Sequence, residues 1–354
     1  EIGGDSLSIV RMIAEVADVF DVDIDLADVY RDPTLFACAA LIDQAEAGYR
    51  KQIRPAAPRK YYPASATQKR MVVTTSADSE SVAYNVPSLF VFEGSLDENR
   101  LREALRALIE RHGVLRTSLL VHKGSVVQQV HRKTSLPFES VTCPDNRIAI
   151  CAKEHVRPFD VSEAPLMRLV SIRTPKRHAL LFDFHHAVCD QAGFEIVIKD
   201  FSALYRGETL PALAIDYKDY ATWDESRFAS GAMDGHAAYW REQLADTVPP
   251  LSLPSDHPRT GKRKGAVCEL RIPRDRLDTF SAFVHTEKAT VTGALMTAFG
   301  LVLSRMAAQD EVVVGIPVSG RSQTMLQHVA GAFINTLPVR CHFDAGHSIR
   351  ACFE

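Results

Sequence analysis

The spacing of apolar residues predicts helices at the beginning of the chain. Apolar side chains recur at helical spacing through residues 6–20, and Asp5 or Ser6 is a suitable N-cap for that helix. A second helix is expected over residues 32–47, because Asp-Pro is a common helix start. Residues 1–48 are therefore expected to form two helices and an acidic connector, which is too little material for a stable core of its own.

A polar stretch separates these helices from the rest of the chain. Residues 49–62 contain two prolines and five Lys or Arg side chains but little aliphatic material. This composition is typical of a solvated linker. We expect a new domain to begin near Pro63.

From Pro63 onward, strand-like and helix-like patterns alternate. The expected elements are strands at 88–94, 168–173 and 178–186, helices at 96–118 and 194–207, and a hairpin at 119–131 around Lys123-Gly124. Asp97 is expected to cap the helix at 96–118 and Gly113 to end it. The alternation predicts an α/β fold with mixed sheets.

Two strongly apolar segments follow in the last quarter of the chain. Residues 291–307 form a nearly all-apolar helical pattern, and residues 311–321 an apolar strand with a turn. A helix that is apolar on all sides is normally buried. Both segments are therefore expected to lie deep in a core.

Composition narrows the class of protein only a little. Hydrophobic residues make up 46% of the 354 residues and the formal net charge is −3, so neither nucleic acid nor an anionic membrane is an expected partner. No apolar run reaches the roughly 20 residues needed to span a bilayer, and the first residues do not resemble a signal peptide. The seven cysteines form no CxxC pair, which favours a reducing cytoplasmic location. Both ends read as cuts within a longer polypeptide.

The first candidate for chemistry is Ser6, within the run GGDSL at 3–7. Two glycines permit a tight loop, and Ser6 is expected at the start of a helix. A phosphodiester on its hydroxyl would lie at the helix N-terminus, where free N–H groups favour negative charge. Two other interpretations remain: Ser6 simply caps the helix, or it is the nucleophile of a GDSL-type esterase. The esterase requires an apolar strand before the serine, and the preceding residues contain none.

The second candidate is the pair His185-His186, which follows an apolar strand and precedes Asp190 and a helix. The end of a strand that faces a cleft is a common place for acid–base chemistry. Neighbouring residues on a strand point to opposite faces, so at most one of the two rings faces a substrate. Asp190 could hold a turn or pair with an arginine. Taken alone, such a pair is more typical of satisfied core histidines.

Several motifs accompany the histidine pair in a fixed order between residues 62 and 340. They are YPASATQKRM (62–71), AYNVP (83–87), RHGVLRTS (111–118), RPFDVSEAPLMR (157–168), HHAVCDQ (185–191), YKDYATW (217–223), YWREQL (239–244), LSLPSDHPR (251–259), VGIPVSGR (314–321) and GAFINTLPVR (331–340). In this order they resemble the motifs of non-ribosomal peptide synthetase condensation domains, a family related to chloramphenicol acetyltransferase. The GGDSL run and the helices around it resemble the C-terminal part of a peptidyl carrier protein.

The resemblance implies an α/β, two-lobed condensation fold like chloramphenicol acetyltransferase, preceded by a partial all-α carrier-protein helical bundle. It divides the chain into a partial carrier at 1–48, a linker at 49–62, a first lobe at 63–245 and a second lobe at 246–354. The second lobe would be much shorter than the first, so we expect it to be incomplete.

The resemblance also implies a reaction and a cofactor. Ser6 would carry covalent 4′-phosphopantetheine, and the acyl or peptidyl group on its thioester would pass to the amine of an acceptor to form an amide. The expected partners are acyl or aminoacyl thioesters and neighbouring synthetase domains, upstream and downstream, including an adenylation domain and a downstream carrier protein. No metal is expected.

Site residues can be carried over position by position. They are His185, His186, Asp190, Arg321, Arg111 and Arg116. His186 would orient the amine and help to remove its proton, and Asp190 would be structural, paired with Arg321. Arg111 and Arg116 would shape the site, and Asn335 would lie beside it.

One departure from the family motif keeps other functions open. Gln191 stands where the family has Gly, which permits backbone angles and close approach that Gln tolerates poorly. A degenerate docking module is therefore one alternative; an epimerisation domain and an ester-forming acyltransferase are two others. Asp5 favours epimerisation, whereas AYNVP, LPSDHPR and the lack of an EGHGR-type motif argue against it. A heterocyclisation domain would have DxxxxD in place of the histidine pair.

Overall fold

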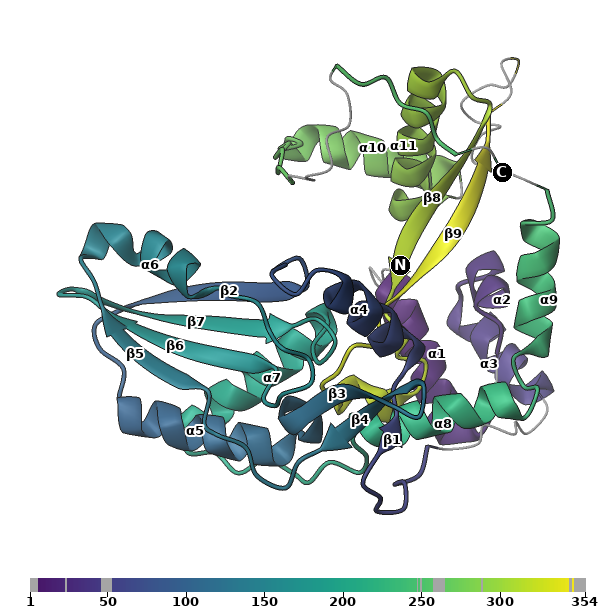
Figure 1. Ribbon diagram of the computed structural model, residues 1–354. Helices are drawn as coiled ribbons and strands as arrows, with labels where there is room; N and C mark the ends of the chain where they lie inside the picture. The colour runs from purple at the N-terminus through teal and green to yellow at the C-terminus, as the bar shows by residue number, and fades with distance from the viewer. Residues whose placement is uncertain are drawn as a thin grey trace. The chain divides into compact units, whose positions relative to one another are not determined.

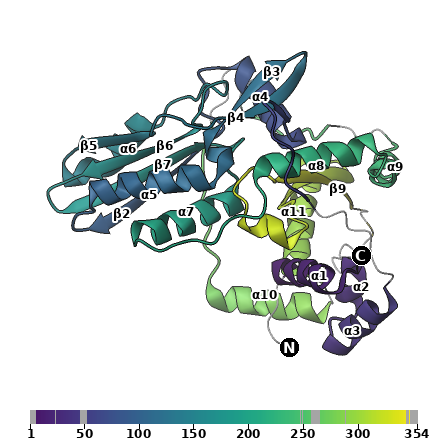
Figure 2. The same ribbon diagram turned by 90° about the horizontal axis from the view of Figure 1, so that it is seen from below.

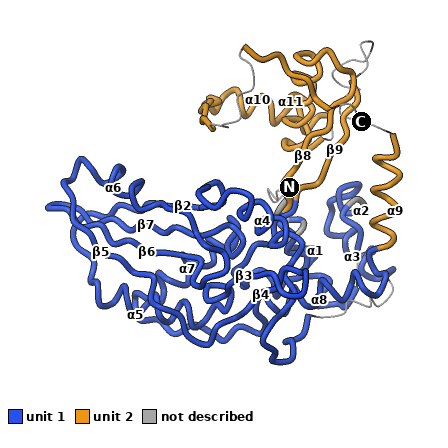
Figure 3. The backbone as a smooth tube through the Cα atoms, viewed as in Figure 1, with its two compact units in different colours: residues 1–233, 319–335 blue, residues 234–318, 336–354 orange. Residues whose placement is uncertain are grey.

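The computed structural model describes residues 6–22, 24–45, 53–246, 248, 250–256, 265–287, 289–343 and 346. The chain divides into two compact units, residues 1–233 with 319–335 and residues 234–318 with 336–354 (Figure 3). These units differ from the lobes expected from the sequence. The first boundary falls after Met233 instead of Ala245, and residues 319–335, which we call the strap, belong to the first unit although most of their neighbours in the chain belong to the second.

The carrier-like segment forms three helices, one more than expected. They are α1 (Ser6–Phe20), α2 (Leu26–Arg31) and α3 (Leu35–Gln44), shown in purple in Figure 1. A small apolar cluster joins them through Ile13, Val29 and Cys38. The last helix begins later than expected because Thr34 is its N-cap, accepting a hydrogen bond from the Ala37 N–H at 3.2 Å. The N-cap expected for α1 at Asp5 lies outside the described residues.

A four-stranded mixed sheet forms the centre of the first unit. Its order is β2-β7-β6-β5, with β5 and β6 parallel and the other pairs antiparallel. The strands are β2 (Asn85–Glu93), β5 (Phe138–Thr142), β6 (Met167–Arg173) and β7 (Arg177–His185). Strand β7 lies in the middle of the sheet and is buried at every residue after Arg177, as its apolar sequence requires.

Helices cover the two faces of this sheet. Helices α5 (Glu98–Arg111) and α7 (Gln191–Tyr205) lie side by side on one face (Figure 2), packed with Phe182 and Phe184. Helix α6 (Ile148–His155), which follows the 3₁₀ turn η2 (Asp145–Arg147), packs on the opposite face against alternate residues of β6 and β7. Because alternate residues of a strand point to opposite faces, each face of the sheet has its own apolar cluster.

The other three described strands of this unit form a second sheet. Its order is β1-β4-β3, from β1 (Tyr62–Pro63), β3 (Thr117–His122) and β4 (Ser125–Val130). The expected hairpin turn is confirmed: Lys123 and Gly124 both have positive φ, 50° and 78°, as a two-residue type I′ turn requires. Helices α4 (Ala66–Ala77) and α8 (Tyr217–Ala229) begin with capping boxes at Ser65 and Asp216.

The helix ends confirm one prediction and correct another. Asp97 caps α5 by accepting hydrogen bonds from the N–H groups of Asn99 and Arg100. Gly113 does not end this helix, which stops at Arg111; it begins the 3₁₀ turn η1 (Gly113–Arg116) instead. Glycine is required there because a Cβ atom would lie 1.9 Å from Oδ2 of Asp216.

The second unit has less buried apolar surface than the sequence predicts. Its elements are α9 (Asp234–Gln243), α10 (Arg274–Thr286), α11 (Val291–Ala307) and a two-stranded sheet of β8 (Glu311–Val318) and β9 (Asn335–His342), whose first residue belongs to the first unit. Helix α11 was expected to be deeply buried, yet Leu295, Phe299 and Val302 are 47–54% exposed. The expected burial of β8 is also wrong, because most of its residues are only partly covered. Within the described residues, α10 and one sheet cover only part of α11.

No single helix in the described part of the chain is long and apolar enough to cross a membrane. Helices α10 and α11 pass such a test only when taken together, and they are bent by 99° where they meet.

Candidate active site

The end of strand β7 holds the histidine pair. His185 is the last residue of the strand and is 1% exposed, whereas His186 begins the turn to α7 and is half-buried. The backbone N–H of His186 donates to the carbonyl of Tyr84 at 2.7 Å, which ties the turn to the entry of β2. We call residues 185–190 the histidine turn.

The His185 ring is held in one neutral form. Its Nδ1 accepts a hydrogen bond from the Ala187 N–H at 3.1 Å, so this nitrogen carries a lone pair. The proton of the neutral ring is therefore on Nε2, which lies 3.2 Å from Oγ1 of Thr75. Burial, and to a smaller degree the neighbouring His186, lower the pKa of His185 to about 4. At neutral pH the ring therefore accepts a hydrogen bond at Nδ1 and donates one from Nε2, both within the protein.

The His186 ring has a different environment. Its Nδ1 is enclosed and has no hydrogen-bond partner among the described residues. A buried polar atom without a partner is unusual and calls for a specific explanation. The backbone of His186 is therefore fixed while its ring is not committed to a protein group at Nδ1.

Asp190 is saturated with hydrogen bonds. Oδ1 accepts from the Gly193 N–H (2.7 Å), which caps α7, and from Nη2 of Arg321 (3.1 Å); Oδ2 accepts from the N–H groups of Phe333 (2.8 Å) and Ile334 (3.2 Å). The expected pair between Asp190 and Arg321 is present, and both side chains are about 95% buried. All four contacts are structural, so this carboxylate has little capacity left to contact a substrate.

Arg321 lies in the strap and contacts several of its other residues. Its Nη1 donates to the carbonyls of Leu326 (2.5 Å) and Val329 (2.6 Å), on and just after the 3₁₀ turn η3 (Thr324–His328). Its guanidinium also lies over the Phe333 ring, 4.1 Å from the centroid. One side chain therefore joins three points of the strap to Asp190.

Tyr217, for which the sequence motifs predicted no individual role, is a second anchor of the strap. It is fully buried, and its Oη donates to the carbonyl of Ala332 at 2.7 Å and contacts Oγ of Ser65 at 2.8 Å. Burial raises the pKa of this phenol, so it stays protonated and able to donate. Gly331 (φ +158°) is required beside it, because a Cβ would lie 2.0 Å from the tyrosine ring.

Comparisons with known proteins identify the family. A model of the condensation domain matches residues 59–353, and a model of the phosphopantetheine attachment site matches residues 1–42. The chain belongs to the condensation-domain family. The predicted family and fold are confirmed, as is 4′-phosphopantetheine as the group that the first domain carries on a serine.

The relatives are peptide synthetases. The chain is 34% identical to tyrocidine synthase 2 of Brevibacillus parabrevis over 343 residues and 32% identical to surfactin synthase subunit 1 of Bacillus subtilis over 345 residues. These alignments cover 96% and 97% of this chain, but the chain spans only about a tenth of either relative.

Solved condensation-fold structures are similar at lower identity. The X-domain from teicoplanin biosynthesis, solved in complex with OxyB, has a TM-score of 0.78 at 22% identity, covering 86% of this chain and 71% of that one. The first condensation domain of the calcium-dependent antibiotic synthetase has a TM-score of 0.68 at 19% identity, with 83% and 72% covered. These likenesses bear on the fold alone.

The departure at Gln191 causes no backbone strain in this condensation domain. Gln191 is the exposed first residue of α7, does not have positive φ, and donates from Nε2 to Glu195 at 3.1 Å. The close approach is made by Gly193 instead, where a Cβ would lie 2.9 Å from the Gly331 carbonyl oxygen. The sequence alone left the effect of Gln191 open; the structure shows an unstrained backbone at this residue and places the close contact at Gly193.

The two arginines of the RHGVLRTS motif hold the scaffold. Arg111 donates from Nε to Asp200 (2.7 Å) and from Nη1 to the carbonyl of Pro211 (2.5 Å), joining α5 to α7 with help from His112. Arg116 donates to the carbonyl of His131 at 2.6 Å. None of these partners belongs to the histidine turn or the strap. Asn335 lies at the start of β9 and is exposed.

Ser6 is the first residue of α1. Its side chain, like the whole of Gly3, Gly4 and Asp5, lies outside the described residues. The backbone nevertheless begins a 15-residue helix at this serine, and a helix N-terminus suits the negative charge of a phosphodiester. The site predicted from GGDSL is thus compatible with the attachment domain.

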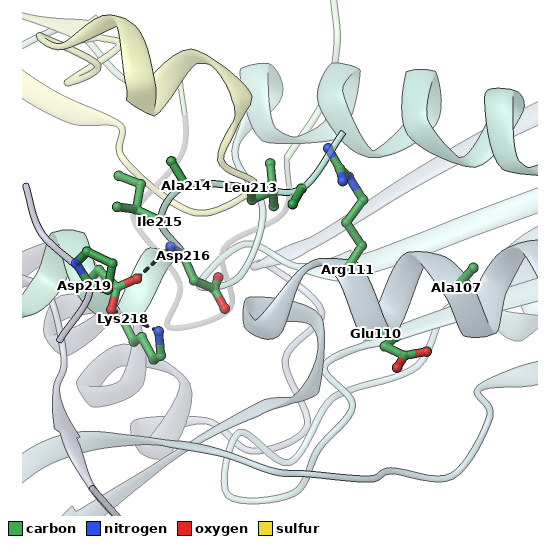
Figure 4. A pocket seen from close by; sticks show the side chains of 11 residues that line it. Ala107, Glu110, Arg111, Leu213, Ala214, Ile215, Asp216, Lys218 and Asp219 are labelled. Atoms are coloured by element: carbon green, nitrogen blue, oxygen red, sulfur yellow. Dashed lines mark hydrogen bonds and ion pairs between the residues drawn. The ribbon is translucent and has the colours of Figure 1, made fainter. Parts of the chain in front are cut away.

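A pocket of about 540 Å³ lies elsewhere on the first unit, between the end of α5, the loop before α8 and the start of α8 (Figure 4). Its cations are already engaged: Arg111 with Asp200 and Lys218 with Asp219. Neither the histidine turn nor the strap lines it. We assign it no ligand.

Proposed function

We propose that this condensation domain transfers an acyl or peptidyl group from a phosphopantetheine thioester to the amine of an acceptor, forming an amide. The observation that carries the proposal is the contrast between neighbours in the motif. His185 and Asp190 use their polar atoms in hydrogen bonds to the scaffold, whereas the half-buried ring of His186 makes no hydrogen bond to another described residue. His186 is then the group of the motif available to the reaction.

In the proposed reaction, the amine nitrogen attacks the thioester carbonyl carbon. A C–N bond forms, the C–S bond breaks, and the thiol leaves. The amine loses one proton, which the His186 imidazole accepts or guides towards the leaving sulfur. The phosphopantetheine supplies only the activated thioester.

Positioning supplies much of the expected acceleration. Holding two reactants in register can account for several kcal/mol of the barrier. Asp190 and Arg321 serve this purpose indirectly, because they fix the strap beside the histidine turn. Arg111 and Arg116 also hold parts of the first unit together, but neither bonds a residue of the histidine turn or the strap.

We further propose Ser6 as the serine that carries the donor. Intact mass after treatment with a phosphopantetheinyl transferase and coenzyme A should show one added arm, and Ser6→Ala should abolish it. An arm that persists in Ser6→Ala would refute this assignment. The neighbouring carrier, adenylation and condensation domains of a longer synthetase would be the partners, as in the peptide synthetases that the chain resembles.

The experiment for the reaction itself loads the carrier with a labelled acyl group and adds an amine acceptor. An amide product supports the proposal. An ester, a racemised thioester or an unchanged thioester would point instead to ester formation, epimerisation or a docking module. The docking module is the second candidate, because the similar X-domain fold is known in a complex with another protein.

A further inference from the structure

Helix α4 contacts both the histidine turn and the strap. Thr67 on this helix donates to the carbonyl of Ile334 in the strap at 2.9 Å. The next residue, Gln68, donates from Nε2 to the carbonyl of Ala187 in the histidine turn at 3.2 Å. These contacts place α4 where it can hold the two segments in register.

The orientation of the Gln68 amide is fixed. Gln68 is fully buried, and its Oε1 accepts from the N–H of Ser65 at 3.1 Å as part of the capping box. The amide nitrogen is therefore the atom that faces Ala187, and it is the only end of this side chain that can donate. A glutamate would turn that donor into a second oxygen facing the carbonyl.

Thr75 continues the same face of α4. It lies seven residues, two helical turns, after Gln68 and is buried against the ring of His185. Because Nδ1 of His185 accepts from Ala187, the Thr75 hydroxyl receives the Nε2 proton. The Ala187 N–H fixes this tautomer, and the Thr75 hydroxyl is the partner that satisfies the buried Nε2–H of the ring.

These contacts meet on the backbone of His186 and Ala187. The Ala187 N–H is held by His185 and the Ala187 carbonyl by Gln68, while the His186 N–H is held by Tyr84. The backbone on both sides of His186 is therefore fixed, although Nδ1 of its ring has no partner among the described residues. The direction of the His186 side chain follows from that backbone.

We propose that Gln68 and Thr75 are positioning residues that orient His186 for the transfer. This inference rests on the proposed function, in which His186 serves the amine. Loss of either contact should lower the transfer rate at saturating acceptor more than the affinity for the acceptor, because both side chains are buried within the protein.

The kinetic test uses Thr75→Val, which removes the hydroxyl at constant shape, and Thr75→Ser, which keeps it. Thr74→Val is the matched control, since the Thr74 hydroxyl is exposed and donates to the Arg70 carbonyl within α4. In single-turnover transfer from the loaded carrier, we expect Thr75→Val to be slower by roughly tenfold or more. Thr75→Ser should stay within about threefold of the parent and Thr74→Val should match it. Gln68→Leu should behave as Thr75→Val.

A spectroscopic readout separates this inference from the proposed function. Nitrogen-15 spectra of histidine-labelled chain report the tautomer of each ring, with His185 identified through His185→Gln. We expect the Nε2–H form of His185 in the parent, and altered His185 and His186 ring signals in Thr75→Val. A parent that transfers nothing would refute the proposed function, and the spectra would still decide the inference. Unchanged ring signals in a folded Thr75→Val, or a parent-like transfer rate in both Thr75→Val and Gln68→Leu, would overturn it.

Discussion

Asp190 and Arg321 lie 131 residues apart in the sequence and form a buried ion pair, with Nη2 3.1 Å from Oδ1. The same carboxylate caps α7 and holds two N–H groups of the strap. One side chain thus joins the histidine turn to a segment from a distant part of the chain. The hydrogen bonds of Asp190 therefore fix the arrangement of these segments from within the protein.

Removing the Asp190 carboxylate should destabilise the first unit. Asp190→Ala leaves Arg321 buried without its counter-charge and two strap N–H groups without an acceptor, so we expect a loss of about 3–5 kcal/mol of stability. Thermal melting measures it, and Glu208→Gln, at an exposed pair with Arg206, is the control expected to change little. If Asp190→Ala kept full stability while turnover disappeared, the carboxylate would belong to the chemistry.

Gly193 should be intolerant of a side chain. In Gly193→Ala the new Cβ would lie 2.9 Å from the Gly331 carbonyl oxygen, so α7 and the strap must separate. We expect a cost of about 1–3 kcal/mol, measured by melting temperature. Gly235→Ala is the matched control, because its Cβ would meet nothing within 4 Å, and we expect it to be neutral or stabilising by up to about 1 kcal/mol. Equal behaviour of the two variants would mean that the strap is not packed against α7.

Gln191 should be replaceable by glycine. The residue is exposed and unstrained, so Gln191→Gly should cost at most about 1 kcal/mol of helix stability. Transfer from the loaded carrier should continue at the parent rate. A large gain in rate from Gln191→Gly would instead identify the glutamine as the cause of a weakened site.

His185 should make stability depend on pH. Its pKa is lowered from 6.5 to about 4 on folding, mainly by burial. The neutral ring therefore contributes stability that is present above about pH 6.5 and is lost as the pH falls towards 4. Relative to His185→Gln, the parent should lose about 2–3 kcal/mol between pH 7.5 and pH 4.

The measurement is denaturant unfolding of both proteins across this range. Burial raises the pKa of Asp183 to about 6, so this group stabilises the folded state as the pH falls, opposite to His185. Asp183 is present in both proteins, so its contribution cancels in the difference between them. A pH-independent difference between parent and His185→Gln would show that the ring is not held neutral.

Local patterns predicted much of this structure. Runs of apolar residues predicted β6, β7 and α11 almost to the residue, and Asp97 and Lys123-Gly124 followed from rules for caps and turns. The Asp190–Arg321 pair came from the family resemblance, because no local signal joins residues so distant in the sequence.

Tertiary contacts account for what the sequence did not predict. The need for glycine at 113, 193 and 331 arises from close approach to other segments, which no local pattern reports. The partner of Arg111 was not predicted for a similar reason: Asp200 lies on another helix, so the motif alone could not show this pair. The exposure of α11 depends on what covers the helix, which its own sequence does not reveal.

The two histidines offer the most direct test of the account. His185→Ala removes a buried ring that bonds Thr75 and Ala187, so its main effect should be a lower melting temperature. His186→Ala removes a half-buried ring with an unpartnered Nδ1, so stability and loading of the carrier should change little.

The decisive measurement is single-turnover amide formation from the loaded carrier, in the parent and in His186→Ala, at saturating amine. We expect His186→Ala to slow transfer by roughly a hundredfold or more at an unchanged melting temperature. Transfer by His186→Ala at the parent rate would contradict a role for this ring in the reaction.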